Sequence, residues 1–241
     1  MESSLQTIVA NYNWLGSVLS LLLIVLFTKT GKYLLFKVPA LANARQENRR
    51  EDKQKLAKEK YPPMVKANQK VGLYLNLTFF FLILPFCVTL APQPWWQVLL
   101  DIVVVLMVYD FFYYLMHRFL FHGQGKMRQV HAVHHQARNP TYIDAHYVHP
   151  LETFMGLGLF FVTIASLAAL LGPFHVATIV SMYILYVQLN QINHTRVDLP
   201  YFPYRLLTWI TVKHHKHHEN MHMGNYSTIT LLWDKLFGTF E

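Results

Sequence analysis

Cysteine is almost absent from this chain of 241 residues, which contains a single one, Cys87, inside an apolar run. One cysteine cannot form an intramolecular disulfide, so the sequence excludes a disulfide-stabilised scaffold. It also excludes thiolate zinc sites and iron–sulfur clusters, because both need several cysteines. Any transition metal that this protein binds must therefore be held by nitrogen and oxygen ligands.

Charged residues are scarce as well. Only 14% of the residues are Asp, Glu, Lys or Arg, whereas 53% are hydrophobic and 15% are aromatic. Ordinary globular domains have about 25% charged residues, so this composition lies outside their range. The scarcity of charge predicts a protein that is embedded in a membrane.

Several apolar stretches approach or exceed the roughly 20 helical residues needed to cross a bilayer. They cover residues 13–27 with an extension toward 36, 71–90, 95–116 and 151–189. The last stretch is broken by the sequence Gly-Pro-Phe at 172–174, which predicts a hairpin of two spans or of re-entrant half-spans. We therefore expect an all-α, multi-pass integral membrane bundle with four or five membrane helices.

Positive charge is concentrated between the first two apolar stretches. Residues 29–70 hold twelve Lys and Arg against four acids, a net charge of +8 that equals the formal net charge of the whole chain. By the positive-inside rule this segment is cytoplasmic. Counting spans from it places both histidine-rich regions, residues 117–149 and 194–222, on the same cytoplasmic face. The sequence does not distinguish a bacterial inner membrane from the endoplasmic reticulum.

The basic segment allows two interpretations. It is either a solvated stretch that sets the orientation and lies on anionic headgroups, or one that also docks an acidic partner protein. The segment has few aromatic residues to stack on bases and accompanies no nucleic-acid motif, so we expect no nucleic-acid partner.

Histidine is the residue type that carries the chemistry, with fourteen copies in the chain and five within the ten residues KHHKHHENMH. Neutral imidazole offers a nitrogen lone pair to a metal. Positions i, i+3 and i+4 share one helix face, so each HxxHH motif can direct three imidazoles toward one point. Eight imidazoles exceed the ligands of one zinc site and predict two metal ions, although iron, zinc, copper and nickel all accept imidazole. The motifs are HRFLFH (His117, His122), HAVHH (His131, His134, His135) and the HxxHH part of HHKHH (His214, His217, His218).

The HRFLFH motif requires an irregularity in the helix backbone. His117 and His122 are five residues apart, which is about 140° around an ideal α-helix. The helix must bend, end or bulge there if both imidazoles are to reach one site.

These motifs and the terminal stretch GNYSTITLLWDKLFGTF resemble the fatty acid hydroxylase and sterol desaturase superfamily, over about residues 103–240. The resemblance implies a division into N-terminal membrane helices with the basic loop, residues 1–94, and a hydroxylase-like catalytic region with the histidine boxes, residues 95–241. It also implies that His194, in QINHTR, is an additional ligand beside the eight histidines above. The motif HPLE at 149–152 is similar to one found in some sterol-acting members.

The resemblance further implies a membrane-bound, O2-dependent oxidoreductase with two iron ions, which hydroxylates or desaturates a C–H bond of a sterol, fatty acid or related lipid. The chain has no GxGxxG nucleotide-binding pattern in a βαβ setting. Electrons must therefore come from an external donor, which we expect to be a cytochrome, a ferredoxin or a flavoprotein reductase. Two alternatives remain open, namely a zinc-dependent membrane hydrolase and a non-catalytic metal-binding membrane protein.

Asp110 is the candidate catalytic residue outside the histidines. It lies two helical turns before His117 on nearly the same face, and an ionisable residue inside a span is functional by default. We expect it to hydrogen-bond a ligating histidine, and we expect Asp101 to be structural. The remaining histidines have other expected roles. We expect His146, His149 and His222 to be hydrogen-bond partners of the ligands, or ligands themselves. We expect His215 to face solvent or donate a hydrogen bond, and His175 to be structural on the opposite face.

Overall fold

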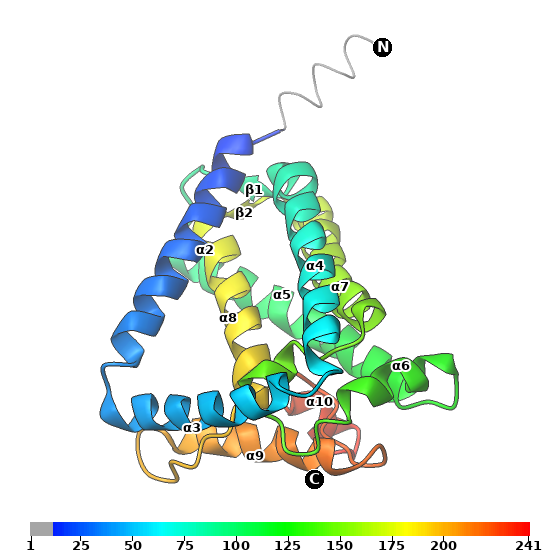
Figure 1. Ribbon diagram of the computed structural model, residues 1–241. Coiled ribbons are helices and arrows are strands. Elements are labelled where there is room, and N and C mark those ends of the chain that lie inside the picture. Colours follow the sequence, from blue (N-terminus) through cyan, green and yellow to red (C-terminus); the bar gives the residue numbers. More distant parts are fainter. Residues whose placement is uncertain (1–11) are drawn as a thin grey trace.

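Long helices arranged side by side, with shorter helices across one end, make up the structure (Figure 1). A computed structural model of the protein describes residues 12–241. The long helices are α2 (Trp14–Leu35), α4 (Tyr61–Thr78), α5 (Trp95–Leu115), α7 (Pro150–Leu171) and α8 (Val176–His194). The helices at the end are α3 (Pro39–Leu56), α6 (Lys126–His134), α9 (Arg205–Glu219) and α10 (Leu232–Leu236). At the opposite end, β1 (Val88–Thr89) pairs in parallel with β2 (Phe174–His175).

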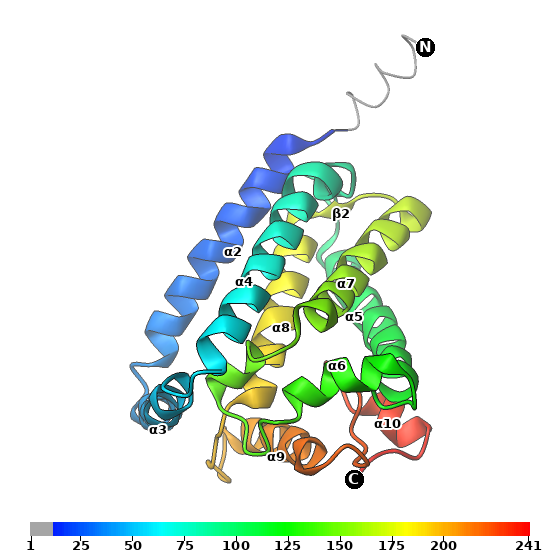
Figure 2. The same cartoon turned by 45° about the vertical axis from the view of Figure 1, so that its right-hand side comes forward.

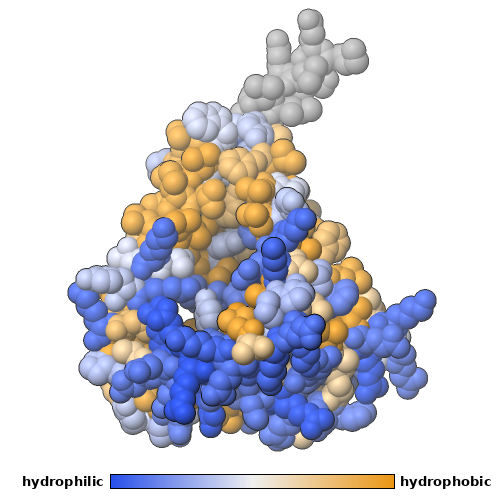
Figure 3. All heavy atoms as spheres, viewed as in Figure 1, coloured by the Kyte–Doolittle hydropathy of each residue, from blue (hydrophilic) through white to orange (hydrophobic). Residues whose placement is uncertain are grey.

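Within the described residues, four helical segments are long and apolar enough to cross a membrane: Trp14–Leu35, Tyr61–Phe86, Trp95–Phe121 and Pro150–Leu171. α8 packs against α2 and α5 within the same bundle, but its last turns carry the amides of Gln188, Asn190, Gln191 and Asn193 and lower its apolar character. Figure 3 shows the apolar side chains around the long helices and the hydrophilic ones at the end with the short helices. The prediction of an all-α membrane bundle is confirmed.

The second membrane helix begins earlier than predicted. α4 starts at Tyr61 rather than at residue 71, with proline in its first turn, where the missing N–H costs nothing. Residues 61–70 include Lys66 and Lys70, so this part of the helix lacks the apolar signal on which the prediction depended. The helix is extended by the π-turn η1 (Phe79–Ile83) and the 3-10 turn η2 (Leu84–Phe86).

The predicted hairpin in the last apolar stretch is present. α7 ends at Leu171 and is capped by Gly172, whose φ of 97° favours a residue without a Cβ. After Pro173 and β2, α8 begins at Val176, and the Nδ1 atom of His175 accepts a hydrogen bond from the N–H of Ala177 at 3.1 Å. The structural role predicted for His175 is therefore confirmed as a helix N-cap.

The core lies where α5, α7, α8 and the end of α4 meet. Phe79 and Phe161 stack with their ring centroids 4.0 Å apart, and so do Phe160 and Tyr186. Phe79, Phe160 and the neighbouring Ile179 are fully buried. These stacked rings hold the long helices together above the end that carries the histidines.

The basic segment contains helix α3, which is tied to the histidine-bearing end by buried polar contacts. The Asp52 carboxylate accepts hydrogen bonds from the Thr141 hydroxyl at 2.8 Å and the Ile143 N–H at 3.0 Å. Lys55 forms an ion pair with the buried Asp144. The basic segment and both histidine-rich regions thus lie at the same end of the bundle, as the span count predicts.

Candidate metal centre

All nine predicted histidines converge at this end of the bundle, where they form two groups. Within each group, one potential ligand atom of every residue lies within 4.8 Å of those of the others. The five-histidine group consists of His117, His122, His131, His135 and His217, and the four-histidine group of His134, His194, His214 and His218.

Neighbouring Nε2 atoms are closely and evenly spaced. In the five-histidine group, His131 lies 3.0 Å from both His117 and His135, and His135 lies 3.1 Å from His217. The four-histidine group has the same spacing, 2.9 Å between His134 and His194, 3.0 Å between His194 and His214, and 3.1 Å between His214 and His218. Two nitrogens bound at about 2.1 Å to one ion and about 90° apart lie about 3.0 Å from each other. The spacing therefore fits one metal ion in each group.

The helix changes type at the HRFLFH motif, as the spacing of its two histidines requires. α5 continues into the π-helical turn η3 (Met116–Phe121), in which the N–H of His122 donates to the carbonyl of His117 at 2.9 Å. An i to i+5 hydrogen bond stacks residues five apart. The two imidazoles consequently lie on the same face, with ring centroids 5.0 Å apart.

Each HxxHH motif divides its histidines between the two groups, so the expectation that all three point to one site is wrong. His131 on α6 and His135 directly after it enter the five-histidine group, and His134 at the end of α6 enters the other. At 100° per residue, positions i and i+4 are only about 40° apart, while the neighbouring i+3 and i+4 differ by about 100°. α9 makes the complementary division, with His214 and His218 in the four-histidine group and His217 in the five-histidine group. Figure 2 shows α6 and α9 crossing beneath the long helices.

Six of the rings are held in orientation through Nδ1. Each of these Nδ1–H groups donates to an acceptor, so that the Nε2 lone pair faces the group interior, as a metal requires. The acceptors are the carbonyls of Tyr226 for His117 (2.6 Å), Met221 for His122 (2.9 Å), Tyr147 for His134 (3.3 Å), Asn190 for His194 (2.8 Å) and Gly224 for His217 (2.7 Å), and the Glu152 carboxylate for His131 (2.8 Å).

Burial keeps the donor atoms neutral. Desolvation lowers the pKa of both His122 and His131 to about 3, and it holds the pKa of His217 and His218 well below the usual value. The Nε2 atom of His122 is buried and has no hydrogen-bond partner among the described residues. A set of neutral, orphaned imidazole nitrogens is a suitable donor set for a transition metal.

Asp110 does not contact a histidine, contrary to prediction. Its carboxylate accepts hydrogen bonds from the backbone N–H groups of Thr228, Ile229 and Thr230, and from the Thr230 hydroxyl, at 2.8–3.1 Å. Asp110 lies two helical turns before His117, but residues 228–230 of the C-terminal segment occupy both of its carboxylate oxygens. Asp110 therefore anchors the segment that provides the Tyr226 carbonyl to His117.

The other histidines stay outside both groups. The Nδ1 atom of His149 accepts from the N–H of Leu151 at the start of α7, and His222 is exposed. His146 accepts a hydrogen bond from Asn68 through its backbone carbonyl. The Nε2 atom of His215 is buried without a hydrogen-bond partner among the described residues.

Glu152 contacts a histidine of the five-histidine group, and the sequence analysis did not predict this contact. It is buried at the first turn of α7 and accepts a hydrogen bond from His131. The signal was an ionisable residue at the start of an apolar span, the same signal that drew attention to Asp110.

A cavity of about 420 Å³ connects the four-histidine group with the membrane helices. Its walls are residues of α4, α5, α7 and α8, including Gly72, Gly156 and Tyr183. At its inner end it is lined by His134 and His194. From Tyr183 to His194 the wall extends along α8 for about 16 Å. The cavity therefore runs between the membrane helices as far as the four-histidine group.

The fold and the site together define a multi-pass membrane protein with paired groups of metal-ligand-type histidines. A sequence profile described as fatty acid hydroxylase matches residues 102–239. The chain belongs to the fatty acid hydroxylase family, within the fatty acid hydroxylase and sterol desaturase superfamily.

Curated relatives carry the names of lipid-modifying enzymes. Methylsterol monooxygenase 1 of Rattus norvegicus is 33% identical over 54% of this chain and 43% of its own length. A putative methylsterol monooxygenase of Dictyostelium discoideum is 31% identical over 63% of this chain and 54% of its own. A very-long-chain aldehyde decarbonylase of Oryza sativa is 34% identical over 61% and 55%. The chain spans about half the length of these relatives. No solved structure matches it significantly.

Proposed function

We propose that the protein is a membrane-bound, di-iron, O2-dependent oxidoreductase that hydroxylates or desaturates a C–H bond of a sterol, fatty acid or related lipid. The observation that carries the proposal is the convergence of two histidine groups at the inner end of a cavity between membrane helices. The names of the methylsterol and long-chain aldehyde relatives support a lipid substrate.

The nine histidines of the two groups would hold the two ions through their Nε2 atoms. Iron bound there supplies the activation of O2 that oxidation of an unactivated C–H bond requires. The protein contributes neutral donors, since burial prevents protonation of the imidazoles. It also fixes ring orientation through the carbonyl and carboxylate acceptors at Nδ1, which raises the basicity of the ligands.

The four-histidine group is the one that faces the lipid. His134 and His194 line the cavity between the membrane helices, and a group of four imidazoles leaves more room for a further ligand than a group of five. The cavity walls hold the lipid chain and exclude bulk water, which protects a reactive oxidant from side reactions. Glu152 also lines this cavity and orients His131, so it connects the two groups.

The net charge of +8 in residues 29–70 supports a cytoplasmic position for the histidine end. There the centre is within reach of an external electron donor, a cytochrome, ferredoxin or flavoprotein reductase. A catalytic zinc ion uses three protein ligands and a water, so even two such ions would use only six of the nine histidines.

The test combines metal analysis with lipid analysis of cells that express the full chain under O2. The purified protein should contain two iron ions, and a hydroxylated or desaturated lipid should form only with O2. His134→Ala and His217→Ala, one from each group, should abolish the product and lower the iron content. Zinc in place of iron, or O2-dependent product in both variants, would refute the oxygenase proposal.

A further inference from the structure

The second half of α2 and helix α3 meet at an angle (Figure 1), and their facing surfaces are here called the wedge. The buried residues of α2, Gly16, Ser17, Ser20 and Ile24, all belong to its first half. Farther along, Leu26 and Leu34 are more than half exposed, at 54% and 56%. The second half of α2 therefore keeps an apolar side that the described residues leave exposed.

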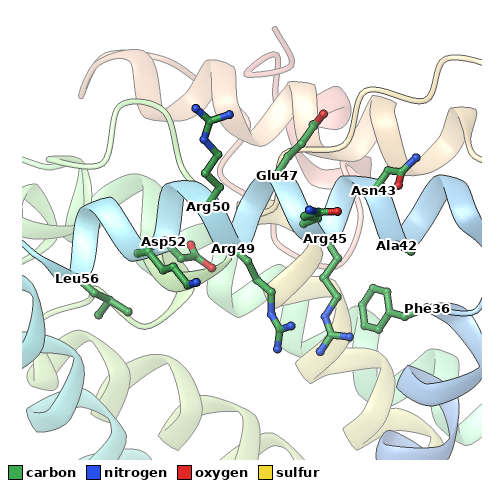
Figure 4. A pocket seen from close by; sticks show the side chains of 11 residues that line it. Phe36, Ala42, Asn43, Arg45, Glu47, Arg49, Arg50, Asp52 and Leu56 are labelled. Carbon is green, nitrogen blue, oxygen red and sulfur yellow. The ribbon is translucent and has the colours of Figure 1, made fainter.

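Helix α3 forms one side of this wedge and gives it a basic surface. A pocket of about 1120 Å³ lies there and is lined by α3 together with Phe36. In Figure 4 the side chains of Arg45 and Arg49 extend to the same side of α3, the side on which Phe36 lies. They are four residues apart, one helical turn, so their guanidinium groups lie side by side. The Arg45 guanidinium also stacks over the Phe36 ring, 4.0 Å from its centroid.

The two arginines lack carboxylate partners. Among the residues that the structure describes, neither Arg45 nor Arg49 forms an ion pair. Glu47 also lines the pocket, but its side chain extends to the side of α3 opposite the two arginines (Figure 4). The Asp52 carboxylate is occupied by hydrogen bonds from Thr141 and Ile143. The four basic side chains that line the pocket therefore outnumber its two acids, Glu47 and Asp52, and the pocket keeps a net positive charge.

The depth of α3 in the membrane indicates which kind of molecule binds in the pocket. α2 has 22 residues, so it is about 33 Å long, close to the roughly 30 Å of the hydrocarbon core. α3 follows directly after its end and therefore lies at the level of the lipid headgroups. Guanidinium pairs bind phosphate through parallel N–H donors, and apolar chains cover exposed leucines.

We propose that this wedge is a binding site for an anionic phospholipid, whose phosphate lies on Arg45 and Arg49 and whose acyl chains lie along the exposed side of α2. The lipid is separate from the substrate, because the substrate cavity lies between α4, α5, α7 and α8. The bound lipid fixes α3, which in turn holds the loop before α7 through Asp52 and Thr141. The proposal requires membrane insertion and does not depend on the metal chemistry.

Native mass spectrometry of the full-length protein, released from vesicles of equal parts phosphatidylcholine and phosphatidylglycerol, tests this site. The wild type should retain phosphatidylglycerol in excess over phosphatidylcholine. Each basic contact to an anionic lipid is worth roughly a fivefold change in binding. The double variant Arg45→Gln/Arg49→Gln should therefore lose at least about fivefold of that enrichment.

The matched control is Lys58→Gln/Lys66→Gln, which removes the same charge. Lys58 and Lys66 are both exposed and neither lines the pocket, so this variant should keep the enrichment. Equal loss in both double variants would show a general charge effect and overturn the proposal. It would also be overturned if Arg45→Gln/Arg49→Gln kept its lipid enrichment but lost electron transfer from an acidic donor, because the surface would then belong to a protein partner. The metal content of every variant, measured in parallel, separates this result from the fate of the oxygenase proposal.

Discussion

Glu152 accepts a hydrogen bond from the Nδ1 atom of His131 at 2.8 Å, and both side chains are almost completely buried. This contact joins the first turn of α7 to α6 and to the five-histidine group. A carboxylate in this position fixes the tautomer of the ring and raises the basicity of its Nε2 atom.

We predict that Glu152→Ala lowers the metal affinity of the five-histidine group by about 10–100-fold. Glu152→Gln should lose less, because its amide oxygen still accepts from His131. Competition with a chelator, followed by metal analysis, measures the affinity. Exposed Glu219 supplies the control, since Glu219→Gln removes a carboxylate near the ligands of α9 without touching Nδ1. An unchanged affinity in Glu152→Ala would exclude an orienting role.

Each histidine group should lose its metal ion independently of the other group. His135 belongs to the five-histidine group and His218 to the four-histidine group. We expect each of the variants His135→Ala and His218→Ala to retain about half of the wild-type metal content, since one group remains intact. His222→Ala, at an exposed histidine outside both groups, should keep the full content. Elemental analysis of the purified variants gives the stoichiometry, and complete loss in both would indicate a single shared site.

Asp110 should act on the stability of the C-terminal segment. The variant Asp110→Asn keeps the size of the side chain but replaces a charged acceptor of four hydrogen bonds with a neutral amide. We expect the melting temperature to fall by about 5 °C, because hydrogen bonds to a charged group are worth more than neutral ones. Thermal unfolding in detergent measures the effect, and Asp101→Asn on the same helix serves as control. Equal melting temperatures would contradict the anchoring role.

The cavity between the membrane helices should be blocked by a side chain at Gly72. A Cβ added to Gly72 meets no heavy atom within 4 Å, and this residue lines the cavity. Gly72→Leu is therefore compatible with the helix and should stabilise it slightly, but its side chain should lower lipid turnover about tenfold or more by occupying the space of the substrate.

Gly31→Leu is the matched control for this substitution. Gly31 is also a helical glycine with open space around it, but it does not line the cavity. Metal content should be unchanged in both variants, and product formation should fall only in Gly72→Leu. Normal turnover in that variant would place the substrate elsewhere.

The single cysteine allows a direct test of orientation. In a Cys87→Ser background, Ala91→Cys introduces a thiol in the loop before α5, and Lys58→Cys introduces one at the histidine end. The positive-inside rule predicts that a membrane-impermeant maleimide labels only Ala91→Cys in intact cells. Lys58→Cys should react only after the membrane is made permeable. Labelling in the reverse order would invert the orientation.

Local sequence patterns predicted those features that depend on neighbouring residues. Apolar length predicted the membrane helices, and Gly172 with Pro173 predicted the turn between α7 and α8. The start of α4 at Tyr61 was not predictable in this way, because the lysines of its first turns have no apolar periodicity. The division of the chain at residue 94 and the metal and catalytic roles of the site residues remain predictions.

The sequence by itself determined which side chains are available: nitrogen donors without thiolates, apolar helices, and positive charge at one end of the bundle. Only the tertiary structure decided how those donors divide into groups of five and four, because the division depends on where α6 and α9 cross the ends of α5 and α8. It likewise decided that Asp110 binds the C-terminal segment while Glu152 binds His131. Spacing along one helix specifies the direction of a side chain, but its partner comes from a distant part of the chain.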